Sequence, residues 1–256
     1  MTAEGGGIFE RLDESGRDIF DGWSAGDPVR GGLAACRVHA PVRPSKIVCV
    51  GLNYRDHAAE MKKPLPDEPM LFLKPSTSVL DPGAAIRLPP GVGAVHHEAE
   101  LAVVIGTRAK YVSEAEALDH VAGYAVCNDV SEREYQIERS NGQWDKGKSC
   151  ETFNPCGPWL ATADELGDIL ELEMWLDVNG VRRQTGSTAT MIFDPFFLVH
   201  YLSQFMVLEP GDLISTGTPP GVGMGMKPPT YLAAGDVMEL GIAGLGTQRQ
   251  DVIDAP

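Results

Sequence analysis

The sequence predicts an α+β protein built largely of mixed β-sheet, with few helices. Three observations lead to this class. Apolar runs of strand length recur between glycine and proline residues, and only one long apolar run carries a helix-start signal. The chain has 256 residues, 43% of them hydrophobic, which is enough for one large domain. We expect a small N-terminal subdomain over residues 1–45 and a main domain over residues 46–256.

The first part of the main domain predicts strands joined by short connections. KIVCVG (residues 46–51) and PMLFLKP (residues 69–75) are apolar runs of strand length. Between them, NYRDHAAEM (residues 53–61) suits a short helix or an ordered loop. Further on, Ser113 and Glu116 have the spacing of a capping box, which predicts a short helix after them.

The segment VHHEAELAVVIG (residues 95–106) predicts a strand with two carboxylates at its entrance. Side chains alternate between the two faces of a strand, so Glu98 and Glu100 point the same way. Both faces are apolar beyond them, which favours a strand covered on both sides. Two like charges there repel each other and lose hydration. Either a cation or basic side chains must compensate them, and the pattern leaves both possibilities open.

The next predicted strand, VAGYAVCNDV (residues 121–130), brings a third carboxylate, Asp129, near its end. SEREYQIER (residues 131–139) after it suits a helix. If the two buried strands are neighbours, all three carboxylates gather at one end of the sheet. Three carboxylates without clustered histidine or cysteine suit a hard cation, Mg²⁺ or Mn²⁺, with water in the remaining positions. For His96 and His97, which flank this site, we expect a supporting or structural role.

The last third of the chain predicts a hairpin, a helix and two further strands. Residues 172–184 form two strand-like runs around Asn179-Gly180, a sequence typical of tight hairpin turns. Asp194-Pro195 has the order of an N-cap followed by a first-turn proline, which opens an apolar helix extending to about residue 206. Two Gly-Asp pairs then each precede a predicted strand, in EPGDLIST and in AAGDVMEL.

Composition excludes several classes of protein. The formal net charge of -15 disfavours nucleic acid and anionic membranes as partners, and no apolar run is long enough to span a membrane. No signal peptide is evident, so we expect a cytoplasmic protein. The five cysteines are odd in number and form no C-x-x-C pair, which favours free structural thiols in a reducing compartment. They are Cys36, Cys49, Cys127, Cys150 and Cys156.

Three further features carry weaker signals. Lys148 lies in a polar loop, WDKGKSCET, where a lysine is usually solvated. The glycine-rich segment STGTPPGVGMG (residues 215–225) is either an anion cradle or a plain turn, and it matches no phosphate-loop pattern. His57 and Glu60 are three residues apart, so a helix would place them on one face. They form either an oriented general base or an ordinary surface pair.

An ordered set of motifs resembles the fumarylacetoacetate hydrolase family, from residue 46 to about residue 250. In finer detail, ERSNGQWDKGKSCET, GSTATMIFDP and GTPPGVGMGMKPP resemble the branch of this family that hydrolyses 2,4-diketo-3-deoxy sugar acids such as L-rhamnonate or L-fuconate derivatives. The motifs that carry the family resemblance are GLNYRDHAAEM, LFLKPSTSV, HHEAELAVVIG, VAGYAVCNDVSEREYQ, KGKSCETFNPCGPWL, VNG, MIFD and LEPGDLISTGTPPGVG.

The resemblance implies a mixed β-roll core, usually in a homodimer, and a set of site residues. It implies His57 and Glu60 as a water-activating pair and Lys148 as a lysine that faces the substrate. It implies that the Mg²⁺ or Mn²⁺ ligands are Glu98, Glu100 and Asp129. The further substrate contacts that it implies are Arg133, Gln136 and Thr218.

The function that the resemblance implies is metal-dependent hydrolysis of a carbon–carbon bond in a 2,4-diketo acid, giving pyruvate and a second small acid. Alternatives within the family are oxaloacetate decarboxylation and isomerisation of a hydroxymuconate-type diacid. An alternative from another class is a non-catalytic module that binds a divalent metal. Some acylpyruvase-like members have arginine after the glycine of the first motif. This chain has Leu52 there, which weakens transfer of their substrate preference.

Overall fold

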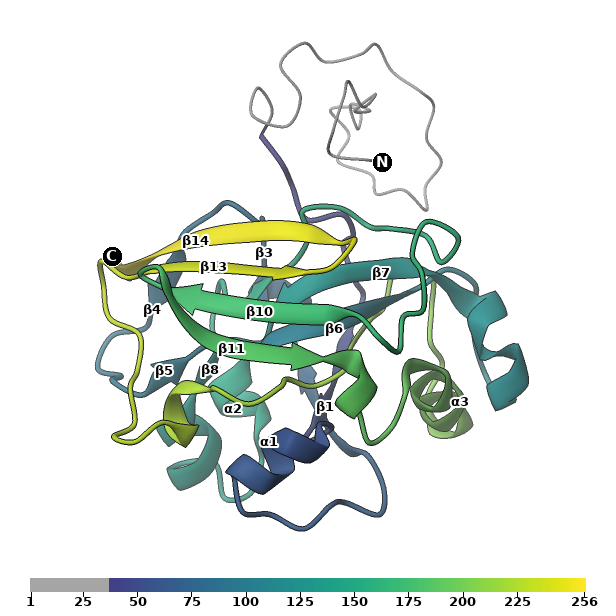
Figure 1. Cartoon of the computed structure of the whole chain (residues 1–256), viewed down its shortest axis with the longest axis horizontal. Coiled ribbons are helices and arrows are strands. Elements are labelled where there is room, and N and C mark those ends of the chain that lie inside the picture. Colours follow the sequence, from purple (N-terminus) through teal and green to yellow (C-terminus); the bar gives the residue numbers. More distant parts are fainter. Residues whose placement is uncertain (1–36) are drawn as a thin grey trace.

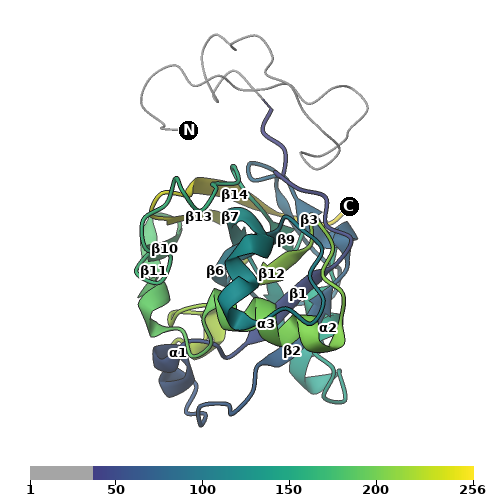
Figure 2. The ribbon, with the colours of Figure 1, turned by 90° about the vertical axis from the view of Figure 1, so that its right-hand side faces the viewer.

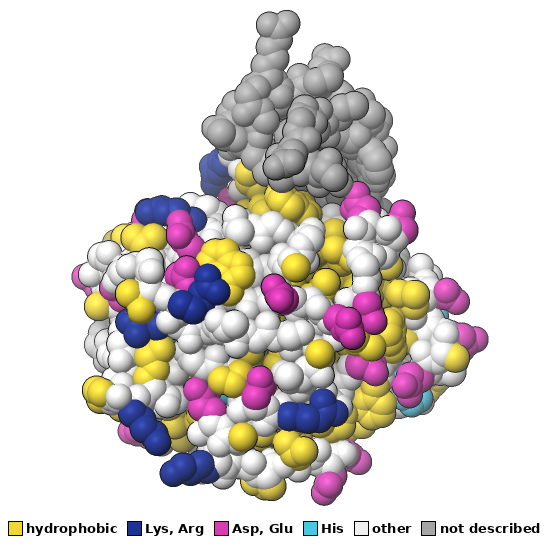
Figure 3. Space-filling view, viewed as in Figure 1, with side chains coloured by type: hydrophobic (Ala, Val, Ile, Leu, Met, Phe, Trp, Pro, Cys, Tyr) yellow, Lys and Arg dark blue, Asp and Glu magenta, His cyan; other side chains and the backbone are white. Residues whose placement is uncertain are grey.

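The computed structural model describes residues 37–256. The predicted N-terminal subdomain therefore lies outside the described residues except for residues 37–45, which contain no helix or strand. Within the described part, no helix is long and apolar enough to cross a membrane. Figure 3 shows acidic and basic side chains scattered over the described part of one face, with no continuous basic patch.

Two five-stranded sheets form the body of the main domain, as Figures 1 and 2 show. The first has the strand order β2-β1-β12-β6-β7, and the second has the order β11-β10-β13-β14-β4. In the first sheet, the strands are β2 (Met70–Lys74), β1 (Ile47–Gly51), β12 (Leu213–Ser215), β6 (Ala99–Ile105) and β7 (Val121–Asn128). In the second, they are β11 (Val181–Ser187), β10 (Glu173–Val178), β13 (Val237–Ile242), β14 (Gly246–Asp254) and β4 (Ile86–Leu88).

Each sheet is mixed, which confirms the predicted class. β1 runs parallel to β12, and β14 runs parallel to β4, while the other pairs in both sheets are antiparallel. Two short pairs lie beside the sheets: β3 (Val79–Leu80) with β9 (Asn154–Pro155), and β5 (Val95–His96) with β8 (Ser131–Glu132). The α-helices are α1 (Arg55–Glu60), α2 (Asp145–Lys148) and α3 (Pro195–Phe205).

Strand β6 lies at the centre of the core and is buried along its whole length. Leu101, Val103 and Ile105 belong to the cluster between the two sheets, together with residues of β10 and β13. Ala102 and Val104 belong to a second cluster, on the opposite face of the first sheet. The strand is therefore covered on both sides, as its sequence predicts.

Local signals in the sequence mark a hairpin turn, the start of α3 and a 3-10 helix. Asn179 and Gly180 both have positive φ, at 53° and 72°, and join β10 to β11. The Asp194 carboxylate accepts a hydrogen bond of 2.9 Å from the backbone N–H of Phe197 at the start of α3. The predicted capping box at Ser113 is present and opens a 3-10 helix over Glu114–His120.

One predicted element is wrong in its detail. Residues 131–139, expected as one helix, divide into strand β8 and a π-helix over Glu134–Glu138. The reason is tertiary, because the first two residues pair with β5, where Ser131 lies opposite His96. Three more short 3-10 helices complete the described chain, over Ser76–Ser78, Thr188–Thr190 and Gly223–Gly225.

Candidate metal centre and active site

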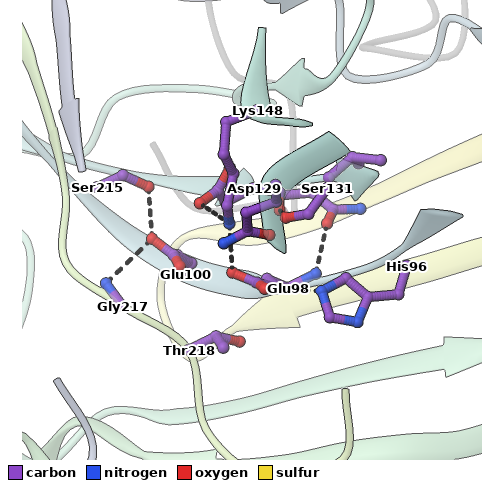
Figure 4. Close-up of polar contacts among 12 residues, drawn as sticks. His96, Glu98, Glu100, Asp129, Ser131, Lys148, Ser215, Gly217 and Thr218 are labelled. Atoms are coloured by element: carbon purple, nitrogen blue, oxygen red, sulfur yellow. Dashed lines mark hydrogen bonds and ion pairs between the residues drawn. The ribbon is translucent and has the colours of Figure 1, made fainter. Parts of the chain in front are cut away.

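Three carboxylates converge where the start of β6 meets the end of β7. The antiparallel register places Ala99 opposite Asn128, so Glu98 and Asp129 flank that pair. Oxygen atoms of Glu98, Glu100 and Asp129 all lie within 4.8 Å of one another. The three residues are 8%, 2% and 0% exposed, and Figure 4 shows their side chains turned toward a common point. The gathering expected from the two strands is therefore present.

Two buried lysines contact this carboxylate cluster. The ammonium of Lys148, on α2, lies 2.9 Å from Oε2 of Glu98 and 2.6 Å from Oδ2 of Asp129. The ammonium of Lys74, at the end of β2, lies 2.5 Å from Oδ1 of Asp129. The sequence left open whether a cation or basic side chains compensate the carboxylates. For Glu98 and Asp129, basic side chains supply positive charge. Lys74 is a site residue that belongs to no predicted site motif, although a lysine that ends the apolar run LFLK is a visible signal.

Of the three clustered carboxylates, Glu100 is the one that forms no ion pair with a described residue. Its Oε2 accepts hydrogen bonds from the Ser215 hydroxyl at 2.6 Å and from the Gly217 N–H at 3.0 Å. Burial, together with the charges of Asp129 and Glu98, raises the pKa of Glu100 to about 8. A carboxyl whose pKa is raised in this way ionises more readily when a further positive charge lies beside it, and a divalent cation bound to the three carboxylates would supply that charge.

Glu98 is held in its charged form by its neighbours. Burial by itself would raise the pKa of Glu98, but the Lys148 ammonium and a hydrogen bond from His96 outweigh burial and hold it well below the usual value. The Nδ1 atom of His96 accepts a bond of 3.3 Å from the Met224 N–H, so its Nε2 carries the proton and donates to Oε1 of Glu98 at 2.8 Å. Burial lowers the pKa of His96 to about 3, which keeps the ring neutral.

His97 is turned to a different partner. Its Nε2 lies 3.2 Å from the carbonyl oxygen of Gly221, and its Nδ1 is buried without a hydrogen-bond partner. Burial lowers the pKa of this imidazole to about 4. Both histidines thus have contacts that suit the supporting role expected for them.

The donor set suits a hard divalent cation. Three carboxylate oxygens converge in a buried position, and no cysteine or unprotonated histidine nitrogen is aimed at them among the described contacts. Mg²⁺ and Mn²⁺ prefer such oxygen ligands, with water completing the shell. Glu98, Glu100 and Asp129 could therefore hold a divalent metal.

Helix α1 places His57 and Glu60 in contact. Nδ1 of His57 lies 2.9 Å from Oε2 of Glu60, and the other carboxylate oxygen, Oε1, accepts a 2.9 Å bond from the Gly221 N–H. Because a carboxylate only accepts, Nδ1 carries a proton, and in the neutral ring the lone pair then lies on Nε2. His57 is 9% exposed, so the pair does not lie on open surface. The contact and its burial are what an oriented general base would require.

The three expected substrate contacts have different surroundings. Arg133 donates a 2.7 Å bond to Oε1 of Gln136 and lies 3.6 Å from Glu98. The side-chain N–H₂ of Gln136 is fully buried and has no hydrogen-bond partner in the described structure. The Thr218 hydroxyl donates to the Ala99 carbonyl and accepts from Gln184, both at 2.8 Å. Thr218 is thus already engaged within the protein.

Backbone N–H groups of the glycine-rich segment donate hydrogen bonds to side chains of the protein itself. The N–H groups of Gly217, Gly221 and Met224 donate to Glu100, Glu60 and His96, respectively. These donors are therefore not free to cradle an external anion. Sequence reasoning missed this role, since backbone donors leave no signature of their acceptors.

No hydrogen bond joins a described thiol directly to the clustered carboxylates, although Sγ of Cys127 lies 3.1 Å from the Ser215 hydroxyl that donates to Glu100. Cys49, Cys127 and Cys156 are buried and Cys150 is partly exposed, and all four are free. Cys36 lies outside the described residues. Burial raises the pKa of Cys156 to about 12, which makes it a poor nucleophile.

Known proteins share this sequence and fold. Residues 46–253 match the family model described as fumarylacetoacetate (FAA) hydrolase, C-terminal. A relative from Burkholderia cenocepacia (strain HI2424) that carries a provisional hydrolase name is 54% identical over 224 residues, which cover 87% of this chain and 78% of that protein.

Two solved structures show the similarity in three dimensions. The 5-carboxymethyl-2-hydroxymuconate delta-isomerase from Mycobacterium smegmatis is 41% identical with a TM-score of 0.78, over 88% of this chain and 84% of that one. A fumarylacetoacetate hydrolase from the psychrophilic Exiguobacterium antarcticum is 39% identical with a TM-score of 0.77, over 85% of this chain and 78% of that one.

Proposed function

The chain belongs to the fumarylacetoacetate hydrolase family, and on that premise we propose that it is a Mg²⁺- or Mn²⁺-dependent hydrolase of 2,4-diketo acids. Its products are pyruvate and a second small acid, and its substrates are of the 2,4-diketo-3-deoxy sugar acid type. One observation carries the proposal: the oriented His57–Glu60 pair on α1. Hydrolysis needs a base that activates water. Decarboxylation and isomerisation, which pass through an enolate, need no activated water.

The carboxylate cluster supplies the binding half of the site. Glu98, Glu100 and Asp129 would hold the ion, and the ion would supply Lewis-acid chemistry to the site. The unpartnered N–H₂ of Gln136 and the guanidinium of Arg133 offer donors for the substrate's oxygens. Mn²⁺ suits the same oxygen donors as Mg²⁺.

The residues of the chain account for the bond changes. Nε2 of His57 takes a proton from water, and the charge that develops on the ring is stabilised by Glu60. The resulting hydroxide adds to the C4 carbonyl, and the ammonium of Lys148 stabilises the oxyanion. The C3–C4 bond then breaks. Its electron pair leaves with the pyruvate half as an enolate, which takes up the proton that His57 removed from water and becomes pyruvate. C4 becomes a carboxylic acid, which loses its proton to solvent.

A second candidate is isomerisation of a hydroxymuconate-type diacid. The observation that favours it is the similarity to the isomerase from Mycobacterium smegmatis, which is about as strong as that to the hydrolase. This reaction moves a proton within the substrate and breaks no carbon–carbon bond. Oxaloacetate decarboxylation and a non-catalytic metal-binding role are the remaining alternatives.

The experiment that separates these reactions is a substrate panel. The metal-loaded protein is incubated with 2,4-diketo-3-deoxy sugar acids, oxaloacetate and a hydroxymuconate-type diacid. Pyruvate release is followed with a coupled dehydrogenase, and conversion of the diacid is followed by its change in ultraviolet absorbance. We expect pyruvate from the diketo sugar acids, and inhibition by oxalate, which mimics the pyruvate enolate. Consumption of oxaloacetate or of the diacid alone would assign the corresponding rival reaction. Metal-induced stabilisation with no turnover would favour a binding module.

A further inference from the structure

We propose that Gly225 is a positioning residue: the bare backbone there leaves the space that the Glu60 carboxylate needs to hold His57. This inference rests on the proposed function, because Glu60 matters to catalysis only if His57 activates water. The two residues are far apart in sequence and meet where α1 contacts the 3-10 helix Gly223–Gly225.

The contact is close and is aimed at one group. A Cβ atom added to Gly225 would lie 2.7 Å from Cδ of Glu60 and 2.9 and 3.0 Å from its two oxygens. Carbon atoms do not approach carboxylates so closely, so a side chain at this position would displace the Glu60 carboxylate. Both of its present hydrogen bonds, to His57 and to the Gly221 N–H, would be disturbed.

The segment that carries Gly225 is itself tied to the carboxylate cluster. The Met224 N–H donates to His96, whose other nitrogen donates to Glu98. Within the segment, the Gly225 N–H donates to the Val222 carbonyl at 2.9 Å. A continuous chain of bonded groups therefore leads from Glu98 to Glu60. It fixes the His57–Glu60 pair relative to the metal ligands, which lie on other elements.

Gly225 differs from the neighbouring glycines in what an added Cβ would meet. At Gly221 and Gly223 the nearest atoms would be backbone oxygens of Arg183 and Thr230, at 1.9 and 2.2 Å. Substitution there would distort the segment itself. At Gly225 the obstacle is the end of a flexible side chain, and its φ is not in the left-handed region, so alanine can adopt its backbone.

The test compares Gly225→Ala with Gly93→Ala, whose added Cβ meets nothing within 4 Å. In Gly225→Ala we expect kcat for diketo acid hydrolysis to fall by about 10²-fold, the size of effect that a misplaced catalytic group produces. The Mn²⁺ dissociation constant, measured by calorimetry, should stay within about twofold in both variants, because the atoms nearest to an added Cβ at Gly225 belong to Glu60 and not to the carboxylate cluster. Unchanged kcat in Gly225→Ala would overturn the proposal.

A double-mutant cycle separates positioning from a general structural defect. If Gly225→Ala acts through the carboxylate, it should have no further effect on kcat when Glu60→Gln is already present. Additive losses would show that alanine at this position damages the site by another route and would overturn the proposal.

An NMR measurement keeps the inference testable if no substrate turns over. The ¹⁵N signals of the His57 ring report which nitrogen is protonated, independently of any reaction. The parent protein and Gly93→Ala should show the Nδ1–H form, and Gly225→Ala should lose it. An inactive parent protein would contradict the proposed function alone, whereas an unchanged His57 spectrum in Gly225→Ala would contradict the role of Gly225.

Discussion

Lys148 and Asp129 form an ion pair with 2.6 Å between Nζ and Oδ2, and both side chains are excluded from solvent. The other oxygen of Asp129 forms an ion pair with Lys74, and the Lys148 ammonium forms a second ion pair with Glu98. The protein thus compensates two of its three clustered carboxylates with its own cations. It leaves the third, Glu100, with hydroxyl and backbone donors.

Lys148→Met should destabilise the metal-free protein. Removing one partner of a buried ion pair leaves uncompensated charge, at a cost of about 3–5 kcal/mol. A divalent ion would replace part of the lost positive charge, so added Mg²⁺ should raise the melting temperature of the variant more than that of the parent. Thermal unfolding with EDTA and with millimolar Mg²⁺ measures both effects. Lys146→Met, an exposed change on the same helix, is the control. Equal shifts for Lys148→Met and the parent would contradict the charge compensation described.

Metal affinity should rise with pH. The pKa of Glu100 is raised to about 8 in the metal-free protein, so most of it is protonated at pH 7. A cation must displace that proton, and affinity should therefore increase by up to about tenfold per pH unit below pH 8 and level off above it. Calorimetric titration with Mn²⁺ in two buffers of different ionisation enthalpy, at pH 7, should show release of one proton. A heat independent of the buffer would mean that Glu100 is already ionised.

Glu100→Gln should remove metal binding while keeping the fold. The amide oxygen can accept the bonds from Ser215 and Gly217 that Oε2 now accepts, so local packing is preserved. The side chain then presents N–H donors, which repel a cation, in place of an oxygen ligand. We expect circular dichroism like that of the parent, no detectable Mn²⁺ binding, and no activity above background. Full activity of the EDTA-treated parent would by itself exclude a metal requirement.

His57→Ala should affect hydrolysis more than decarboxylation. Loss of the general base is expected to lower diketo acid hydrolysis by about 10²–10⁴-fold. Any oxaloacetate decarboxylation should fall much less, because it needs no activated water. Steady-state rates of both reactions give the comparison, and His120→Ala, on the 3-10 helix far from α1 in sequence, is the control. If both rates fell equally at unchanged metal affinity, His57 would act in substrate binding or closure instead.

The sequence by itself predicted the features that depend on near neighbours in the chain. Alternation along the segment of residues 95–106 predicted that Glu98 and Glu100 point the same way, because the period of a strand is fixed by backbone geometry. Asn179-Gly180 and Asp194-Pro195 marked a turn and a helix start, since the hydrogen bonds and φ angles they satisfy are local. The spacing of His57 and Glu60 predicted their contact for the same reason.

Only the tertiary structure decided how the clustered charges are compensated. Lys74 and Lys148 reach Asp129 from 55 and 19 residues away, and strand alternation says nothing about either contact. Likewise, the backbone N–H groups of the glycine-rich segment find Glu100, Glu60 and His96 across the fold. Pairing with β5 also turned the start of residues 131–139 from helix into strand. Such outcomes depend on which distant groups are brought into a common low-dielectric space, where an unpaired polar group is costly and each buried charge must find a partner.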